Sequence, residues 1–461
     1  MNLANSFVLD LLKSESYEIY LVGGIIRDTF LNKENHDKDI IVCDIDAKIF
    51  AQKFADKYNC AFVPLDETNN IYRVVFPDKV NYIDITNPIN NSLEEDLKRR
   101  DITINSIAYN IKTDEIIDIN NGIDDIKNGV IRAISEENFI EDPLRIIRAY
   151  RFASTLGFEI SKETLNIIKK HTDKIIHPAI ERINMEILKL FGGKYAHKIL
   201  LEMDKTGIID ILFPIMLDVK KVPPNTHHHL DLFNHSIETV KQIQTIYEIS
   251  EKAVKEHLDT IDFGGETRLA HLKLAGFLHD IGKFSTWTIE ENGRHRFIGH
   301  DELGANIAKG ILKKQKYSKK QIEYITFIIR HHIYPSSVVS APNINDKIYM
   351  RYVRKAGENS IDLITVAKAD RLSARGVEVS DEMVQKNISD LNKLQDFYLK
   401  VKPTLKPLPK LIDGKEIMQI LNISPSRELG EIINKLHEEQ LEGNITTKED
   451  AISYIKQLKN L

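Results

Sequence analysis

Cysteine is nearly absent from this sequence, which has two cysteines, Cys43 and Cys60, among 461 residues. Two cysteines cannot form a disulfide framework, and this scarcity is typical of a reducing compartment. No run of about 18 apolar residues occurs, so no membrane span is predicted. The first sixteen residues carry acidic side chains and lack a basic segment followed by an apolar one, so no signal peptide is predicted. We therefore expect a cytoplasmic chain.

An excess of positive charge is also missing. The chain has 63 basic and 68 acidic side chains, a net charge of −5. A nucleic-acid partner would therefore have to be held by a local basic surface. Hydrophobic residues make up 42% and charged residues 28%, as in ordinary globular proteins. The length predicts two to four domains.

The stretch from Glu18 to Leu31 (EIYLVGGIIRDTFL) predicts a strand, a glycine turn and a short helix. Residues up to Val22 are apolar enough for a buried strand, and Gly23 and Gly24 interrupt it. A tight turn into a helix start presents backbone N–H groups to which an anion can bind. The pair of glycines therefore indicates a phosphate site, although many such pairs are plain turns.

Two carboxylates follow this turn. Asp37 and Asp39 flank Lys38 and lead into the apolar run Ile40 to Val42. If residues 37–42 form a strand, its alternation places both carboxylates on one face and Lys38 on the other. Neighbouring carboxylates are unfavourable unless a cation joins them, and Mg²⁺ carrying phosphates is the natural choice. Together, the glycine turn and the two carboxylates predict a site that binds a metal ion and phosphate groups.

Two later stretches combine arginine with polar side chains. In LKRRDITINSIAYN, Asp101 and Asn105 share a face if the segment is helical, although a surface ion-pair cluster explains it as well. In EDPLRIIRAYRF, Pro143 marks a helix start. Asp142 and Arg145 then lie close together on the helix and offer acceptors and donors to a base edge, or they form an ordinary salt bridge.

The ordered motifs LVGGIIRD, DKD, EEDLKRRDITINSIA, EDPLRIIRAYRF and ERINME resemble the class II tRNA nucleotidyltransferases and bacterial poly(A) polymerases of the polymerase β superfamily. That family adds C, C and A to the 3′ end of tRNA without a nucleic-acid template. The resemblance is close over residues 17–200. It implies a small N-terminal mixed β-sheet head, followed by a mostly α-helical body, in an α+β fold.

The resemblance also implies roles for the matching residues. Asp37 and Asp39 would be catalytic and hold Mg²⁺, with Asp84 as a candidate third carboxylate. Asp142 and Arg145 would pair with the incoming CTP or ATP. The remaining residues expected to bind the nucleotide are Gly23, Gly24, Arg27, Asp28, Arg100, Asp101, Asn105, Arg148 and Arg151.

Two features depart from the family pattern. Around Ile117 the family usually has a proline after the aspartate and two glycines, whereas Ile119 follows Asp118 here and only Gly122 remains. Residues 86–94 (TNPINNSLE) are short where many CCA-adding members have a longer loop. In the family, loss of that loop is associated with enzymes that add only CC, so this feature puts addition of the terminal A in question.

Histidines are concentrated in the middle of the chain: His227, His228, His229, His235, His279, His300, His331 and His332. An adjacent His279 and Asp280 in the apolar run FLHDIGK need polar partners. This region resembles an HD phosphohydrolase-type helical domain, which implies the metal ligands His235, His279, Asp280 and Asp370. His300 resembles an additional ligand for Mn²⁺, Ni²⁺ or another divalent ion, and so does one of the adjacent His331 and His332. Of these two we predict His331.

We expect four parts: a nucleotidyltransferase head (1–135), a helical neck (136–205), the HD domain (206–400) and a helical tail (401–461). The partners implied are the tRNA 3′ end, CTP and ATP, with no membrane and no obligate protein partner. The HD domain implies phosphatase or 2′,3′-cyclic phosphodiesterase activity. The alternatives are a poly(A) polymerase of the same family, and a metal phosphohydrolase with a nucleotide-binding N-terminal half.

Overall fold

The computed structural model describes residues 7–33, 35, 37–226, 228–405 and 409–459, and it divides into two compact units. Unit 1 contains residues 1–214 and 314–317, and unit 2 contains residues 215–313 and 318–461. The candidate His227 and residues 406–408 lie outside the described residues. The α+β class is confirmed, and the division into four parts stays a prediction.

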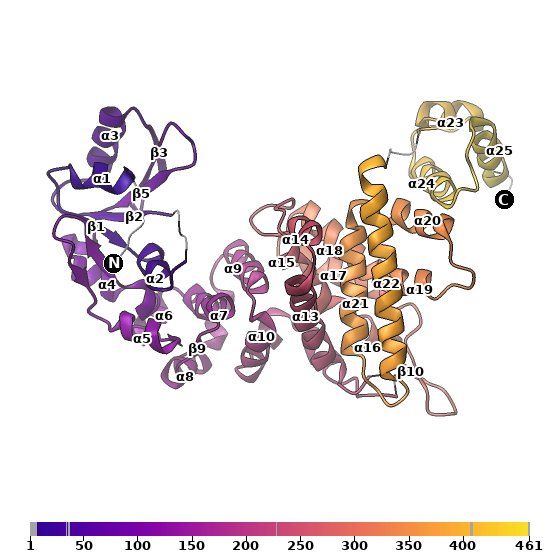
Figure 1. Cartoon of the computed structure of the whole chain (residues 1–461), viewed down its shortest axis with the longest axis horizontal. Helices are drawn as coiled ribbons and strands as arrows, with labels where there is room; N and C mark the ends of the chain where they lie inside the picture. Colours follow the sequence, from indigo (N-terminus) through magenta and orange to yellow (C-terminus); the bar gives the residue numbers. More distant parts are fainter. Residues whose placement is uncertain (1–6, 34, 36, 227, 406–408, 460–461) are drawn as a thin grey trace. The chain divides into compact units, whose positions relative to one another are not determined.

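Unit 1 is built on a mixed β-sheet (Figure 1). Its described strands follow the order β3-β4-β5-β2-β1-β6-β7, with bounds β1 Ile19–Val22, β2 Asp39–Val42, β3 Ala61–Asp66, β4 Ile71–Val75, β5 Tyr82–Thr86, β6 Ala108–Asn110 and β7 Ile116–Ile117. Among the described strands of this sheet, β2 and β5 alone pair in parallel, and their register places Asp39 beside Asp84. This neighbouring pair at one sheet position is the structural basis of the candidate active site.

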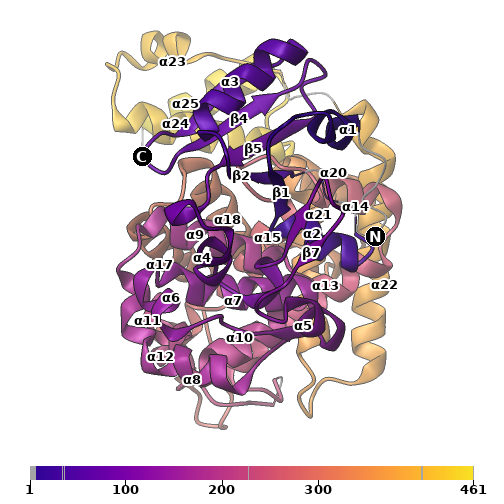
Figure 2. The same cartoon turned by 90° about the vertical axis from the view of Figure 1, so that its left-hand side faces the viewer.

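Helix α3 (Ala47–Tyr58) covers β3, β4 and β5 (Figure 2). Phe50 and Phe54 recur at four-residue spacing on its buried face, and the Asp46 side chain caps its first turn. The other helices around the sheet are α1 Phe7–Lys13, α2 Gly24–Phe30, α4 Leu93–Lys98 and α5 Gly122–Asn128, with the 3₁₀ turns η1 Ile89–Asn91 and η2 Thr103–Asn105.

The apolar stretch 102–109 is not one continuous strand. Ile102 forms a single bridge to Ala133, the 3₁₀ turn η2 follows, and only β6 joins the sheet. Polar side chains explain the interruption, because Thr103 bonds Asp125 and Asn105 bonds Asp101. The segment therefore presents Asn105 toward the site instead of continuing as a strand.

The remainder of unit 1 is helical, as the sequence from about residue 136 predicts. Its helices are α6 Glu136–Glu141, α7 Leu144–Leu156, α8 Lys162–Lys170, η3 Thr172–Ile176, α9 Ile180–Gly192, α10 Ala196–Lys205 and α11 Ile208–Leu212, and β8 Val130–Ile131 pairs with β9 Glu159–Ile160. Helix α7 packs on α9 and α10. It also carries the arginines discussed below, of which Arg151 contacts Glu186 of α9.

Unit 2 is a helical bundle in which α13 packs on α15 and α21, and α21 packs on α22 (Figure 1). Its first helices are α12 Met216–Val219, α13 Leu232–Ile249, α14 Lys252–Leu258, α15 Arg268–Leu278 and α16 Lys283–Thr286. The hairpin β10 Thr288–Ile289 and β11 His295–Arg296 precedes α17 His300–Lys314, α18 Lys319–His331, α19 Tyr334–Val339, α20 Asp346–Ala356, η4 Gly357–Asn359, α21 Ser360–Ser373, α22 Asp381–Val401 and η5 Lys402–Thr404. None of the helices described is long and apolar enough to cross a membrane.

The end of the chain forms three described helices, as predicted: α23 Gly414–Leu421, α24 Arg427–Glu442 and α25 Lys448–Lys459. They share an apolar cluster that includes Ile417, Leu436 and Ile455. The tail therefore has a core of its own within unit 2.

A buried carboxylate in unit 2 makes its stability depend on pH. Asp362 is fully buried and contacts His257 (2.7 Å), Arg268 (3.0 Å) and the Tyr324 hydroxyl (2.6 Å). Burial alone raises its pKa, but His257 and Arg268 lower the pKa of Asp362 to about 2, below the usual 3.8. Because the folded pKa lies below the unfolded one, this stabilisation is complete above about pH 4 and is lost as the pH falls toward 2.

We expect acidification from pH 5 to 2 to remove about 2 kcal/mol of unfolding free energy through Asp362 alone. Asp362→Asn removes this contribution and destabilises unit 2 by about 3–5 kcal/mol at pH 7, because Arg268 and His257 lose their carboxylate. Urea unfolding at several pH values measures both effects. An unchanged acid dependence in the variant would contradict this account.

Candidate active site and candidate metal centre

The glycine turn after β1 lies directly against the catalytic candidates. Gly23 has a positive φ of 76°, which glycine adopts without strain. A Cβ atom there would lie 3.1 Å from Nη1 of Arg100 and 3.8 Å from Oδ2 of Asp39. The missing side chain thus leaves room for a guanidinium, a carboxylate and backbone N–H groups around one small volume.

Two carboxylates, Asp39 and Asp84, are register partners on β2 and β5, and Asp37 lies two residues before β2. The burial pattern confirms the predicted alternation, with Lys38 buried and Asp37 and Asp39 on the open face. Burial, and then the nearby Asp84 and Asp37, raise the pKa of Asp39 to about 6, although Arg100 and Arg73 oppose this. Like charges this close favour a bound cation. The donor set therefore fits a divalent ion that prefers oxygen ligands.

Neighbouring side chains orient two of these carboxylates. Asp84 accepts hydrogen bonds from Nε (2.7 Å) and Nη2 (2.8 Å) of Arg73. The Tyr82 hydroxyl donates to Asp37, and Arg73 lies over the Tyr82 ring at 4.1 Å. Arg73 and Tyr82 were missed in the sequence, since their role arises only from the pairing of β4 with β5.

The Arg27–Asp28 pair forms the wall next to the glycine turn. Arg27 donates to Asp28 through Nε (2.8 Å) and Nη2 (2.9 Å), and through Nη1 to Oδ1 of Asn105 (2.7 Å). Asn35 donates to the same Asp28 carboxylate at 2.6 Å. Both side chains are therefore held in place by their neighbours, a preorganised arrangement of the kind that phosphoryl-type transfer requires.

Asp101 links the head to helix α7. It is buried and accepts hydrogen bonds from Asn105 (3.1 Å) and Arg148 (2.8 Å). Burial alone raises its pKa, but Arg148 and Asn105 hold the pKa of Asp101 below its usual value. The predicted proximity of Asp101 and Asn105 is confirmed, although the 3₁₀ turn η2 produces it and not an α-helix.

The arginines of α7 contact carboxylates from two other elements. Arg148 pairs with Asp101, and Arg151 pairs with Glu186 of α9 at 2.9 Å. Glu186, in the ERINME motif, is buried. Its sequence signal was the acidic residue on an otherwise apolar side of α9. Arg151 also lies 3.6 Å above the Phe152 ring.

The candidate template residues are not on one helix. Asp142 ends α6 with an extended backbone (φ −130°, ψ 91°), and α7 begins only after Pro143. The helix-face argument for Asp142 and Arg145 was therefore wrong, because proline disfavours helical backbone in the residue before it. Nη1 of Arg145 donates to the Asn138 carbonyl (3.0 Å), while Asp142 pairs with Arg182 at 3.1 Å.

The departures from the family motif are stably accommodated. Asp118 accepts the N–H groups of Gly122 (2.8 Å) and Ile123 (2.9 Å), which starts α5. A Cβ at Gly122 would lie 2.3 Å from the Thr103 carbonyl oxygen, so the one retained glycine is required for close packing. In the short segment 86–94, Asn87 donates to the carbonyls of Val42 and Ile45 at 2.8 Å each.

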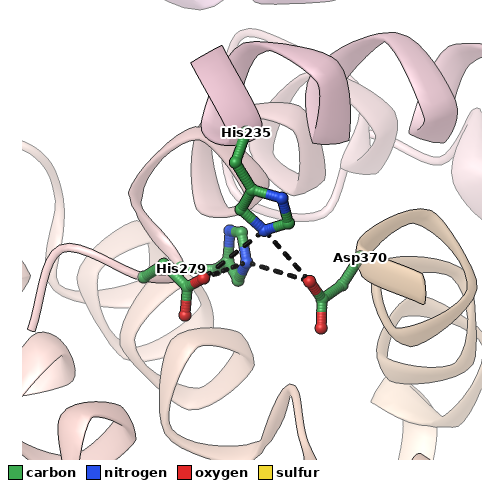
Figure 3. Close-up of side chains that lie close together, drawn as sticks. His235, His279 and Asp370 are labelled. Atoms are coloured by element: carbon green, nitrogen blue, oxygen red, sulfur yellow. Dashed lines mark ion pairs between the residues drawn. The ribbon is translucent and has the colours of Figure 1, made fainter. Parts of the chain in front are cut away.

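Unit 2 brings histidines and aspartates together from separate helices (Figure 3). His235 comes from α13, His279 and Asp280 follow α15, and Asp370 lies on α21. Within the described residues, their ligand atoms lie within 4.8 Å of one another. Asp280 also belongs to a second group with His300 and His332. The structure thus assembles residues that lie up to 135 positions apart in the chain.

His331 is not part of this cluster. His332 is buried with Nε2 3.6 Å from Asp280, whereas His331 packs against the Phe327 ring. The prediction of His331 is therefore replaced by His332. Adjacent residues at a helix end point about 100° apart, and the sequence did not define which of them faces inward.

The donor set fits a metal ion. Nδ1 of His279, His300 and His332 each contacts the backbone carbonyl three residues earlier at 2.6–2.7 Å. This contact leaves Nε2 as the free acceptor, as in metal-binding histidines. Nε2 of His235 lies 3.1 Å from Asp370 and Nε2 of His279 lies 3.1 Å from Asp280, so these buried ligand atoms converge on one small space. Mixed imidazole and carboxylate ligands suit Mn, Fe, Co or Ni.

Electrostatics within the cluster also favour a cation. Burial lowers the pKa of His279, but Asp280 and Asp370 outweigh it and raise that pKa to about 10. Nζ of Lys283 lies 2.5 Å from Asp280 and adds a positive charge at the rim. The buried carboxylates therefore attract positive charge from several directions.

Comparisons with known proteins cover most of the chain. Residues 19–132 match the family described as the poly A polymerase head domain, residues 157–219 the probable RNA and SrmB-binding site of polymerase A, and residues 232–375 the HD domain. The A-adding tRNA nucleotidyltransferase of Deinococcus radiodurans is 29% identical over 95% of this chain and 94% of its own length. The CC-adding tRNA nucleotidyltransferase of Thermus thermophilus is 27% identical over 95% and 93%.

Solved structures share the fold. A CCA-adding enzyme with CTP superposes with a TM-score of 0.58 at 20% identity, covering 99% of this chain and 96% of that one. The Thermotoga maritima CCA-adding enzyme complexed with tRNA gives a TM-score of 0.57 at 21% identity, covering 99% and 96%. The order of the elements is therefore common to these proteins.

Proposed function

Because the chain belongs to the family of tRNA nucleotidyltransferases and poly(A) polymerases and carries an HD domain, we propose that it extends the 3′ end of tRNA without a nucleic-acid template. CTP and ATP supply the nucleotides. The observation that carries this proposal is the group of Asp37, Asp39 and Asp84 beside the glycine turn. Phosphoryl-type transfer requires positioned charge at such a place more than covalent chemistry.

The chain's own residues position the reactants. Gly23 and Gly24 leave space for the triphosphate, and Arg100 and Arg27 offer guanidinium groups beside it. Asp37 and Asp39, with Asp84, would hold Mg²⁺, which neutralises phosphate charge when bound. The tRNA 3′ hydroxyl oxygen bonds to the α-phosphorus, the bond to pyrophosphate breaks, and the hydroxyl proton is released. Four further side chains, which are fixed by hydrogen bonds and ion pairs, would contact the nucleotide: Asp101, Asn105, Arg148 and Arg151.

The choice of nucleotide is assigned to Asp142 and Arg145. Asp142 offers acceptors and Arg145 offers donors, the groups that read base edges. Arg182 pairs with the Asp142 carboxylate and keeps it in one orientation. The remaining lysines and arginines of 145–200 and the helices of 410–461 are candidates for holding tRNA by its phosphates.

We expect Asp142→Ala to change the ratio of kcat/KM for CTP and ATP by about 10-fold or more, since the variant loses hydrogen bonds to one base edge. Arg182→Gln should shift the same ratio less, because Asp142 remains but is less well oriented. Single-nucleotide incorporation with each triphosphate measures the ratio. A uniform loss of rate with both nucleotides would place these residues outside base selection.

The product distinguishes the alternatives. tRNA lacking its last three nucleotides is incubated with labelled CTP, ATP or both. C addition alone identifies a CC-adding enzyme, which the short segment 86–94 favours. Addition of A only to tRNA ending in CC identifies an A-adding enzyme, and long A tails identify a poly(A) polymerase. Complete CCA requires both nucleotides.

A second activity is proposed for unit 2. The buried Nε2 atoms of His235 and His279, which converge with the oxygens of Asp280, favour a divalent-metal phosphohydrolase, acting on phosphomonoesters or 2′,3′-cyclic phosphates at RNA ends. Mn²⁺ and Ni²⁺ are the candidate ions, and a bound ion supplies Lewis acidity toward the phosphate. We place both reactions in the cytosol, in agreement with the unpaired Cys43 and Cys60.

A further inference from the structure

Arg371 has an unusual position beside the candidate metal centre. It follows Asp370 directly on α21. Its Nε is buried and has no hydrogen-bond partner among the described residues. A buried donor without an acceptor is unfavourable, so an acceptor supplied by a ligand would stabilise this position.

This arginine lines a cavity of about 450 Å³. Asp370 and His228 form the wall toward the metal centre, where the His228 ring lies 4.7 Å from the ring of His235. Asn387 of α22 also lines the cavity, and its Oδ1 is buried without a partner. Two unsatisfied polar groups of opposite hydrogen-bonding character therefore face the same space.

The cavity has a polar and an apolar side. Ser336 and Ser340 add hydroxyl groups, and the Lys386 ammonium pairs with Asp390 of the same lining at 3.6 Å. The residues Val339, Val379 and Met383 provide apolar surface. Its volume lies within the roughly 300–1,000 Å³ of small-molecule sites, and a bare phosphate ion would leave most of it empty. The lining matches a molecule with an anionic end and a flat, largely apolar end.

We propose that this cavity binds a nucleoside monophosphate, or the phosphorylated last nucleotide of an RNA, with Arg371 holding the phosphate. The guanidinium fork matches phosphate oxygens, and Val339 and Met383 face the sugar and base. The proposal rests on the phosphohydrolase activity proposed above. There, a water oxygen bonds to phosphorus, the ester bond breaks, and the ribose oxygen takes the proton, releasing inorganic phosphate.

Hydrolysis kinetics test Arg371 directly. The full-length chain loaded with Mn²⁺ or Ni²⁺ hydrolyses adenosine 3′-monophosphate, and Arg371→Gln raises KM by about 10- to 100-fold while kcat changes little. Arg371→Lys keeps the charge and recovers part of the loss. Arg375→Gln is the matched control, because Arg375 pairs with the exposed Asp381 outside the cavity lining. An unchanged KM in Arg371→Gln overturns the proposal.

A local readout separates binding in this cavity from nucleotide binding in unit 1. In Met383→Cys, iodoacetamide alkylation of the new thiol is followed by peptide mass spectrometry with the metal chelated, which distinguishes it from Cys43 and Cys60. Adenosine 3′-monophosphate should slow alkylation at position 383, adenosine should slow it less, and adding Arg371→Gln should remove the protection.

The two arms fail separately. Protection that depends on Arg371 without hydrolysis by any metal-loaded form supports the nucleotide cavity and overturns the hydrolase activity. Hydrolysis without protection, and without dependence on Arg371, overturns the cavity and leaves the hydrolase activity standing.

Discussion

We expect nucleotide incorporation into tRNA to fall by more than about 100-fold in Asp39→Asn, while the variant keeps its fold. Asp39 is the register partner of Asp84, and the charges of Arg100 and Asp37 also act on it. Even outer partners of a bound metal typically contribute 10–100-fold, and a direct carboxylate ligand contributes more. Incorporation of labelled CMP and AMP at saturating nucleotide measures the loss.

Asp56→Asn is the matched control, because Asp56 lies on α3 and bonds Gln52 at the surface. It should keep full incorporation. Circular dichroism and thermal unfolding establish that Asp39→Asn remains folded. Relief of repulsion among three carboxylates should leave its stability equal or slightly higher. A folded Asp39→Asn with normal incorporation would remove the carboxylate group from the mechanism.

We expect Asp280→Asn to lose most of the metal bound to unit 2. Its rate of phosphoester hydrolysis should fall by more than about 100-fold. Asp280 belongs to both groups of candidate ligands, with His279 at 3.1 Å and His300 at 3.2 Å. The neutral amide removes an anionic ligand from both groups at once. Elemental analysis after dialysis against Mn²⁺ or Ni²⁺ measures the metal content independently of activity.

The control for this variant is Asp346→Asn, an exposed carboxylate in the first turn of α20. Nucleotide incorporation into tRNA should stay within about twofold of the unmodified chain in Asp280→Asn, since Asp39 and its neighbours belong to unit 1. Equal metal content in Asp280→Asn and the unmodified chain would show that the cluster does not hold the ion.

The local part of the active site was predictable from the sequence. A strand followed by two glycines and a helix needs only nearby residues, and strand alternation alone places Asp37 and Asp39 on one face. Asp84 could be proposed only weakly, because its position beside Asp39 depends on the register of two strands separated by about forty residues. Pairing of distant strands is set by packing and not by local spacing.

Contacts between distant helices were the main omissions. Arg182 is separated from Asp142 by 40 positions. Glu186 lies on α9 and Arg151 on α7, with α8 and η3 between them in the chain. Neither ion pair therefore has a sequence signal. Choosing His332 over His331 requires knowing which of the two side chains faces inward at the end of α18. The missing acceptor of Arg371 is a property of three-dimensional surroundings, and no pattern of residue types contains it.

The intact mass of the tRNA acceptor tests the central claim most directly. tRNA lacking its three terminal nucleotides is incubated with this chain, Mg²⁺, CTP and ATP, and its mass is then measured. The account predicts discrete increases that correspond to added cytidylate or adenylate residues and that depend on the nucleotide supplied. An unchanged acceptor mass with every nucleotide and with either Mg²⁺ or Mn²⁺ would contradict it.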